Sequence, residues 1–166
     1  MRRIIAFFMA ALLFSFCLCS CDKETRTASE ILGELLENEK KLPDGPIYLT
    51  EAVVGEKEYF PNEKKDSMYG AKAREEFFPL IENYAVYISS FANAFEVAVF
   101  KCYSKSDVDS ICEMCFSRGD TIRTVIGHQK GFENVKVRVI FRGRYVCMYV
   151  GEYPDEAEKV FLNAVK

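Results

Sequence analysis

Histidine is almost missing from this sequence: His128 is the single one among 166 residues. A Ser-His-Asp triad would have to use it, and the chain has no G-x-S-x-G stretch of the kind that presents a hydrolase nucleophile. A glycine-rich phosphate loop is also lacking. Paired carboxylates such as Glu75-Glu76 occur where a helix start or a solvated face explains them. We therefore expect a protein that is not an enzyme and needs no cofactor.

A basic excess is missing as well. The chain has 22 lysines and arginines against 25 acidic residues, a formal net charge of −3. This balance predicts that nucleic acid is not a partner. No polybasic segment follows Cys21 either, so electrostatic attraction to anionic headgroups is not expected to hold the protein at a membrane.

The apolar run near the N-terminus is too short to cross a membrane. The uncharged stretch from Ile4 to Leu18 is about fifteen residues, or about 22 Å as a helix, against a hydrocarbon core of about 30 Å. Arg2 and Arg3 precede it. A positive start followed by a short apolar run is typical of an export signal. An ordinary secretory signal and an uncleaved anchor are the alternatives.

The end of this run resembles the lipobox of bacterial lipoproteins. In Leu18-Cys19-Ser20-Cys21 a leucine lies three positions before Cys21 and a small residue lies directly before it. The resemblance implies a signal peptide over residues 1–20, lipid attachment at Cys21 and a polar tether over residues 21–28. It places the protein at the cell membrane, lipid-anchored and facing the extracytoplasmic side, with the membrane as its first partner.

Four cysteines remain if Cys21 carries lipid: Cys102, Cys112, Cys115 and Cys147. Free, core-packed thiols and at least one disulfide are both open, although a domain of this size does not need such cross-links. The C-x-x-C pair at Cys112 and Cys115 makes a thiol-disulfide oxidoreductase the alternative function. A reactive pair needs its first cysteine at a helix N-terminus, whereas these lie one to two turns into an apolar helix face, which favours packing.

A zinc site is the other reading of these cysteines. Cys112, Cys115 and His128 supply three ligand types, and Cys102 or Cys147 would have to supply the fourth. No second histidine is available, and His128 follows the predicted helix. We expect no metal.

The first half of the chain predicts a helix and little else with clarity. Ser29, or alternatively Thr27, is the expected N-cap of a helix that reaches about Lys41, with leucines and isoleucine on one face. Residues 47–80 are less regular. We expect short strands over residues 47–49 and 52–54 and a short helix over residues 62–70.

Two hairpins dominate the second half. Residues 84–90 and 94–103 predict a hairpin with a loop at residues 90–93 that pairs Val86 with Val97. Residues 135–141 and 144–150 predict a second one around Arg142-Gly143, pairing Val139 with Val146. A helix that Ser104 or Ser106 caps follows the first hairpin, with Gly119 as a candidate interruption, and a helix from Pro154 follows the second.

This order predicts an α+β fold. We expect a β-β-α-β-β-α arrangement with an antiparallel four-stranded sheet, helices mainly on one face and an N-terminal helix before it. Residues 29–166 would form a single domain with its core in residues 84–166. The second sheet face is a candidate binding face for an anionic or sugar-bearing ligand, unless it only lines a half-covered sheet. Its side chains are Tyr87, Lys136, Arg138, Tyr145 and Tyr149.

Several short motifs in residues 68–166 resemble a family of small lipoproteins from Gram-positive anaerobes, a domain family of unknown function. They are Tyr69-Gly70, the stretch from Tyr84 to Ser90, the stretch from Glu96 to Lys101, Gly143-Arg144-Tyr145, and the stretch from Asp155 to Lys159. The resemblance implies a lipoprotein and brings no catalytic residue. We expect a non-enzymatic binding or interaction module whose partner is an envelope protein, peptide or glycan.

Overall fold

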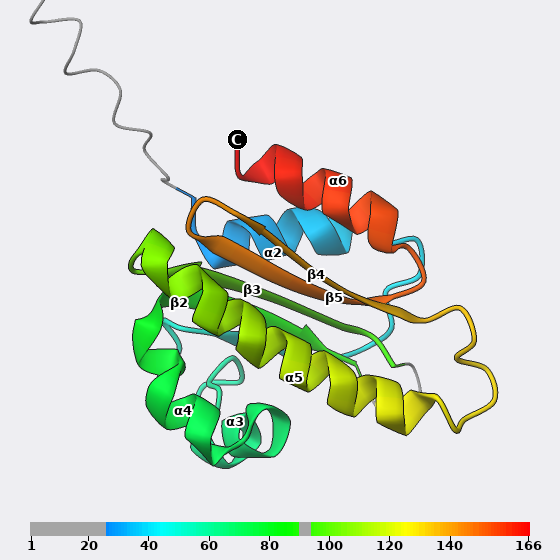
Figure 1. The fold of residues 1–166 in the computed structure, drawn as a ribbon, viewed down its shortest axis with the longest axis horizontal. Coiled ribbons are helices and arrows are strands. Elements are labelled where there is room, and N and C mark those ends of the chain that lie inside the picture. Colours follow the sequence, from blue (N-terminus) through cyan, green and yellow to red (C-terminus); the bar gives the residue numbers. More distant parts are fainter. Residues whose placement is uncertain (1–25, 90–93) are drawn as a thin grey trace, which may run out of the picture.

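The computed structural model describes residues 26–89 and 94–166, which form a five-stranded antiparallel sheet between helices (Figure 1). The strand order is β1-β2-β3-β5-β4. The strands are β1 (Ile47–Leu49), β2 (Ile81–Ile88), β3 (Glu96–Cys102), β4 (Lys136–Arg142) and β5 (Tyr145–Gly151). The helices are α2 (Ala28–Glu37), α3 (Asn62–Tyr69), α4 (Ala71–Glu76), α5 (Val108–Ile126) and α6 (Pro154–Ala164). The α+β class and the β-β-α-β-β-α order are confirmed, and β1 adds an edge strand to the expected four.

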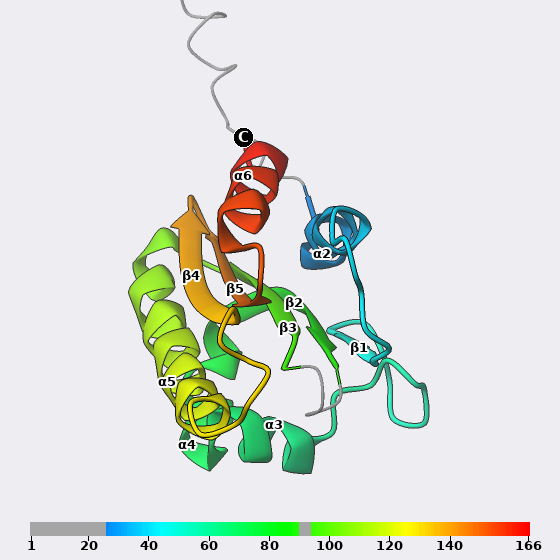
Figure 2. The same cartoon turned by 90° about the vertical axis from the view of Figure 1, so that its right-hand side faces the viewer.

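The helices cover both faces of the sheet, so the prediction that they lie mainly on one face is wrong. Helices α3, α4 and α5 pack on one face, whereas α2 and α6 pack on the other (Figure 2). The central strands explain this arrangement, because every residue of β3 and of β5 is buried. A strand that is apolar on both faces needs a covering layer on each.

The register of the first hairpin differs from the prediction by one residue. Val86 lies opposite Ala98 rather than Val97. The ladder closes with a hydrogen bond from the Ser89 amide to the Phe95 carbonyl over 2.9 Å. A shift of one residue moves every side chain of β3 to the other face. The alternation of apolar and polar side chains could not select the register here, because side chains on both faces of these strands are mostly apolar and buried.

The second hairpin shifts by two residues, which leaves the faces as predicted. Val139 lies opposite Met148, and the turn residues are Gly143 and Arg144. Gly143 has a φ of 62° at the first turn position, the backbone that a type II′ turn requires and that glycine adopts without strain.

The helix termini follow local sequence signals. Thr27, the alternative N-cap, starts α2 in a capping box with Glu30, and the helix ends at Glu37, short of Lys41. Residues 52–54 do not form the predicted strand: residues 52 and 53 have no regular secondary structure, and a turn begins at residue 54. Helix α5 continues through Gly119, where a Cβ atom would lie 2.7 Å from Val137 Cγ1. The missing side chain lets α5 approach β4 closely.

The predicted signal peptide and Cys21 lie outside the described residues. Within residues 26–89 and 94–166, no helix is long and apolar enough to cross a membrane. Both core clusters lie between Ala28 and Val165, so residues 26–166 hold the whole described core.

Candidate functional site

The predicted binding face is covered rather than open. Tyr87, Tyr145 and Tyr149 are all at most 4% exposed, because α2 and α6 lie over them. Their hydroxyls bind groups of this covering layer: Tyr145 donates to the Arg26 carbonyl over 2.8 Å, Tyr149 donates to Glu39 over 2.8 Å, and Tyr87 donates to the Pro43 carbonyl. The prediction of a ligand face is therefore wrong for the three tyrosines, which fasten a helical layer to the sheet.

The two basic residues of that face lie at its border. Arg138 donates to Glu158 over 2.5 Å and to Asp155 over 2.9 Å, which ties edge strand β4 to α6. Lys136 is exposed, and its ammonium donates to the Glu133 carbonyl over 3.4 Å. The five predicted residues thus do not converge on one ligand.

Cys102, Cys112, Cys115 and Cys147 are free and buried, as the packing interpretation predicts. Burial, followed by the nearby Asp109 charge, raises the pKa of Cys112 to about 11. Burial also raises the pKa of Cys115, with the neighbouring thiols adding to the effect. These environments favour the protonated thiol, the opposite of what a reactive C-x-x-C pair needs.

The residues proposed as zinc ligands do not assemble either. His128 is exposed in the turn after α5, whereas Cys112 and Cys115 are buried beneath that helix. Across the described part of the chain, histidine, cysteine and carboxylate side chains form no group of three that could hold a metal ion.

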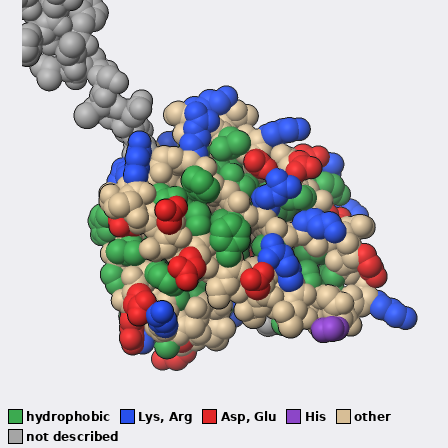
Figure 3. All heavy atoms as spheres, viewed as in Figure 1, with side chains coloured by type: hydrophobic (Ala, Val, Ile, Leu, Met, Phe, Trp, Pro, Cys, Tyr) green, Lys and Arg blue, Asp and Glu red, His purple; other side chains and the backbone are tan. Residues whose placement is uncertain are grey.

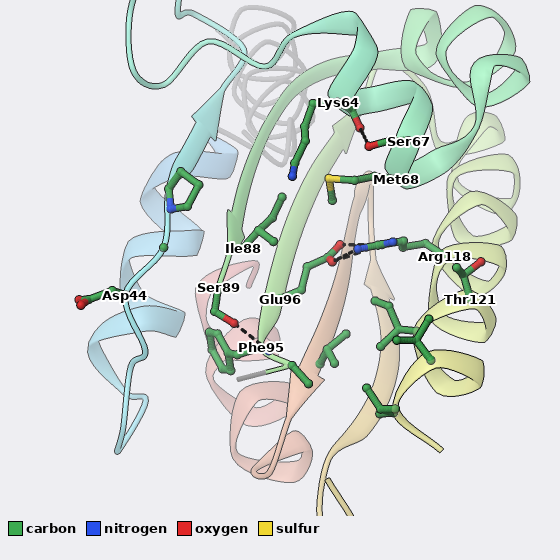
Figure 4. A pocket seen from close by; sticks show the side chains of 17 residues that line it. Asp44, Lys64, Ser67, Met68, Ile88, Ser89, Phe95, Glu96, Arg118 and Thr121 are labelled. Atoms are coloured by element: carbon green, nitrogen blue, oxygen red, sulfur yellow. Dashed lines mark hydrogen bonds and ion pairs between the residues drawn. The ribbon is translucent and has the colours of Figure 1, made fainter. Parts of the chain in front are cut away.

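The candidate site is instead a cavity of about 480 Å³ at one end of the sheet, which we call the end cavity (Figure 4). Its walls come from residues 44–46, the end of β2, the start of β3, and helices α3 and α5. The volume is in the range of small-ligand sites. Its apolar lining residues include Met68, Ile88, Ile122, Val125 and Val150, and its charged ones are Asp44, Lys64, Glu96 and Arg118.

A buried ion pair forms part of the lining. Arg118 of α5 donates to Glu96 of β3 from Nη2 over 2.7 Å and from Nε over 3.2 Å. The side chains are 11% and 4% exposed, respectively. The Tyr69 hydroxyl lies 3.5 Å from the same carboxylate. Burial opposes the charged guanidinium, but the Glu96 charge and hydrogen bonds outweigh it and raise the pKa of Arg118.

Positive charge is left over in the end cavity. Among the described residues no group accepts a hydrogen bond from Nη1 of Arg118, since Nε and Nη2 make all its contacts. Lys64 is exposed on α3, and no described carboxylate lies within ion-pair distance of it. Figure 4 shows the Lys64 side chain extending into the cavity, whereas the Asp44 carboxylate points away from it.

Two smaller hollows adjoin the end cavity. A hollow of about 390 Å³ shares Phe95 with it, and one of about 270 Å³ shares Ile126. Phe132 and Val135 line both smaller hollows. This end of the sheet is therefore recessed in several places. On the face viewed in Figure 3, by contrast, basic and acidic side chains are interspersed and form no patch of one sign.

Sequence reasoning missed the charged pair. Glu96 begins a strand that is buried throughout, and a charge in a buried strand needs a partner, which was the available signal. The one-residue register error placed Glu96 on the face away from α5. Arg118 lies 22 residues from Glu96 along the chain, and only the packing of α5 on the sheet brings the two together.

Comparison of the chain with protein-family models, with curated proteins and with solved structures finds no match. The resemblance to small lipoproteins of Gram-positive anaerobes therefore stays a prediction from its motifs. The site must be interpreted from its own chemistry. An apolar wall beside hydrogen-bond donors can bind and orient a small ligand, and the described residues of the cavity lining include neither histidine nor cysteine.

Proposed function

We propose that this protein is an extracytoplasmic lipoprotein that serves as a non-enzymatic binding module. Cys21 carries the lipid and holds the domain at the outer face of the cell membrane, and the end cavity takes the ligand. The observation that carries this proposal is that the chain enters the fold at one end of the sheet and the end cavity lies at the other.

Hydrogen bonds hold the entering chain at its end of the sheet. The Arg26 carbonyl accepts from Tyr145, the first residue of β5, and the Ala28 amide donates to Asn83, near the start of β2, over 2.7 Å. In Figure 1 α2 begins at the left end of the sheet. The end cavity touches Ile88, the last residue of β2, and Val150, near the end of β5.

The strand length sets the distance between these two ends. Strand β2 has 8 residues, which span about 23 Å at about 3.3 Å per residue. The stretch from Cys21 to Arg26 can extend about 18 Å at most. A lipid on Cys21 would thus keep the entry end close to the membrane, while the end cavity faces away from it and is accessible to ligands.

Membrane attachment can be tested with matched cysteine variants. Wild-type protein, Cys21→Ala and Cys17→Ser are expressed in a bacterial host fed with labelled palmitate, and membranes are separated from soluble protein. We expect Cys21→Ala to lose the label and the membrane association. Cys17→Ser should keep both, because this cysteine leaves with the signal peptide. If Cys21→Ala remained as firmly on the membrane as wild type, the proposal would fail.

A further inference from the structure

The end cavity has an amphipathic lining whose free hydrogen-bonding capacity is cationic. Ile122 and Val150 are buried in its wall, and Val125 is 38% exposed at its surface. The negative charge of Glu96 is paired with the Arg118 guanidinium. Among the described lining residues, Nη1 of Arg118 and the ammonium of Lys64 are cationic donors without a protein acceptor, and the two residues line the cavity from α5 and α3. Such a site suits a ligand that is apolar over most of its surface and negative at one point.

We propose that the end cavity binds a small amphipathic carboxylate. The apolar body of the ligand would pack on Ile122 and Val125, and its carboxylate would accept hydrogen bonds from Arg118 Nη1 and Lys64. This inference rests on the proposed binding function and names its ligand class. A carboxylate is the chemistry that a guanidinium recognises best, because charge-assisted N–H···O bonds are shorter and stronger than neutral ones.

The structure also explains why the site would prefer an anion over a neutral ligand. Glu96 accepts from Nε and Nη2, one edge of the guanidinium, which fixes the orientation of this group before any ligand arrives. A donor that is already positioned costs little conformational entropy on binding. Lys64 adds a charge that no described acidic residue pairs with, so an incoming carboxylate does not have to displace a partner.

Two sources could supply this chemistry, a fatty acid or the C-terminal end of an apolar peptide. The probes are therefore decanoate and decanol, and an acetylated Val-Ile-Leu peptide with either a free or an amidated C-terminus. Binding to residues 22–166, which hold the whole described core, is measured by calorimetry and by amide chemical shifts. We expect at least one acid to bind about tenfold or more tightly than its neutral counterpart.

Three variants test whether binding occurs at the end cavity. Lys64→Gln should weaken the acid about threefold, the effect of an exposed charge pair. Val125→Glu puts a carboxylate beside the ligand and should weaken it more than about tenfold. Lys72→Gln is the matched control, because this exposed lysine on α4 does not line the cavity, and its affinity should equal that of wild type. Urea midpoints check that each variant is folded.

The outcomes separate the possibilities. Tight binding of decanoate alone identifies an acyl chain, and tight binding of the peptide acid alone identifies a peptide carboxyl end; either supports the proposal. It is overturned if acids and neutral probes bind alike, if none binds saturably below about 1 mM, or if shifts and variants place binding elsewhere. Membrane attachment through Cys21 has its own readout, so failure here does not count against it.

Discussion

Replacing Arg118 by methionine would leave a carboxylate with almost no access to water and no countercharge. Glu96 is 4% exposed on its side chain, and its remaining neighbour would be the Tyr69 hydroxyl at 3.5 Å. Methionine has nearly the helix propensity of arginine and a similar stem, so α5 itself should tolerate the change. The expected loss of stability is therefore the cost of an unpaired buried charge.

The magnitude follows from the burial of the pair. Removing one partner of a buried ion pair costs about 3–5 kcal/mol. Arg118→Met should cost about 4 kcal/mol, the middle of this range, because the Glu96 side chain is only 4% exposed. Glu96→Gln should cost less, about 2–3 kcal/mol, because the glutamine carbonyl can still accept a hydrogen bond from Arg118, whose side chain is 11% exposed.

Urea unfolding of residues 22–166 measures both values. With a slope of about 2 kcal/mol per molar urea, a loss of 4 kcal/mol lowers the midpoint by about 2 M. The matched control is Arg123→Met on the same helix, where Arg123 pairs with Asp120 in an ion pair that is about half exposed. It should change stability by less than about 1 kcal/mol, as exposed pairs do.

The double variant Glu96→Leu with Arg118→Met decides whether the cost is that of an orphaned charge. Without either charge it should recover most of the stability that Arg118→Met loses. If Arg118→Met were as harmless as Arg123→Met, or if the double variant were no more stable than Arg118→Met, the reasoning from burial would be refuted.

Three further predictions follow from the same structure. Thr27→Ala should destabilise by about 1 kcal/mol because it removes the N-cap of α2, while Ser29→Ala should have a smaller effect. Burial would raise the pKa of Glu82, but hydrogen bonds and charges from Lys101 and Arg144 outweigh it and lower the pKa. The stability it contributes is then present above its unfolded value of about 4.3 and lost as pH falls through the folded value, and Glu82→Gln should flatten this acid limb in urea titrations. Cys112 and Cys115 should react slowly with a thiol reagent in the native protein and rapidly in denaturant.

Each of these has a clear opposite result. A larger loss of stability for Ser29→Ala than for Thr27→Ala would mean that Ser29, and not Thr27, is the N-cap of α2. An unchanged acid limb in Glu82→Gln would show that the ion pairs with Lys101 and Arg144 contribute nothing to stability. Rapid labelling of either cysteine in the native protein would support the alternative function, a thiol-disulfide oxidoreductase.

Much of the local structure could be predicted from the sequence because its signals are local. The capping residues of α2, the apolar stripe of α6 and the glycine turn between β4 and β5 depend on neighbours a few residues away. The prediction that Cys112 and Cys115 are buried is also confirmed, because their spacing puts both on the apolar face of α5. The lipobox at Cys21 is a local motif as well and stays a prediction.

The long-range arrangement could not be predicted in the same way. Because β3 and β5 are apolar on both faces, their sequence does not distinguish one register from its neighbour, nor one covered face from two. Tyr87, Tyr145 and Tyr149 are amphipathic, and only the position of α2 and α6 decides that they are buried and not available to a ligand.

The sequence by itself determined most of the helices and strands of this protein, through patterns in which interacting residues are close along the chain. Tertiary structure alone decided the candidate site. Lys64, Glu96 and Arg118 come from α3, β3 and α5, and they meet only because helices pack on a sheet whose register no local pattern specifies. Burial then makes the ion pair between Glu96 and Arg118 costly to break, and this burial exists only in the folded chain.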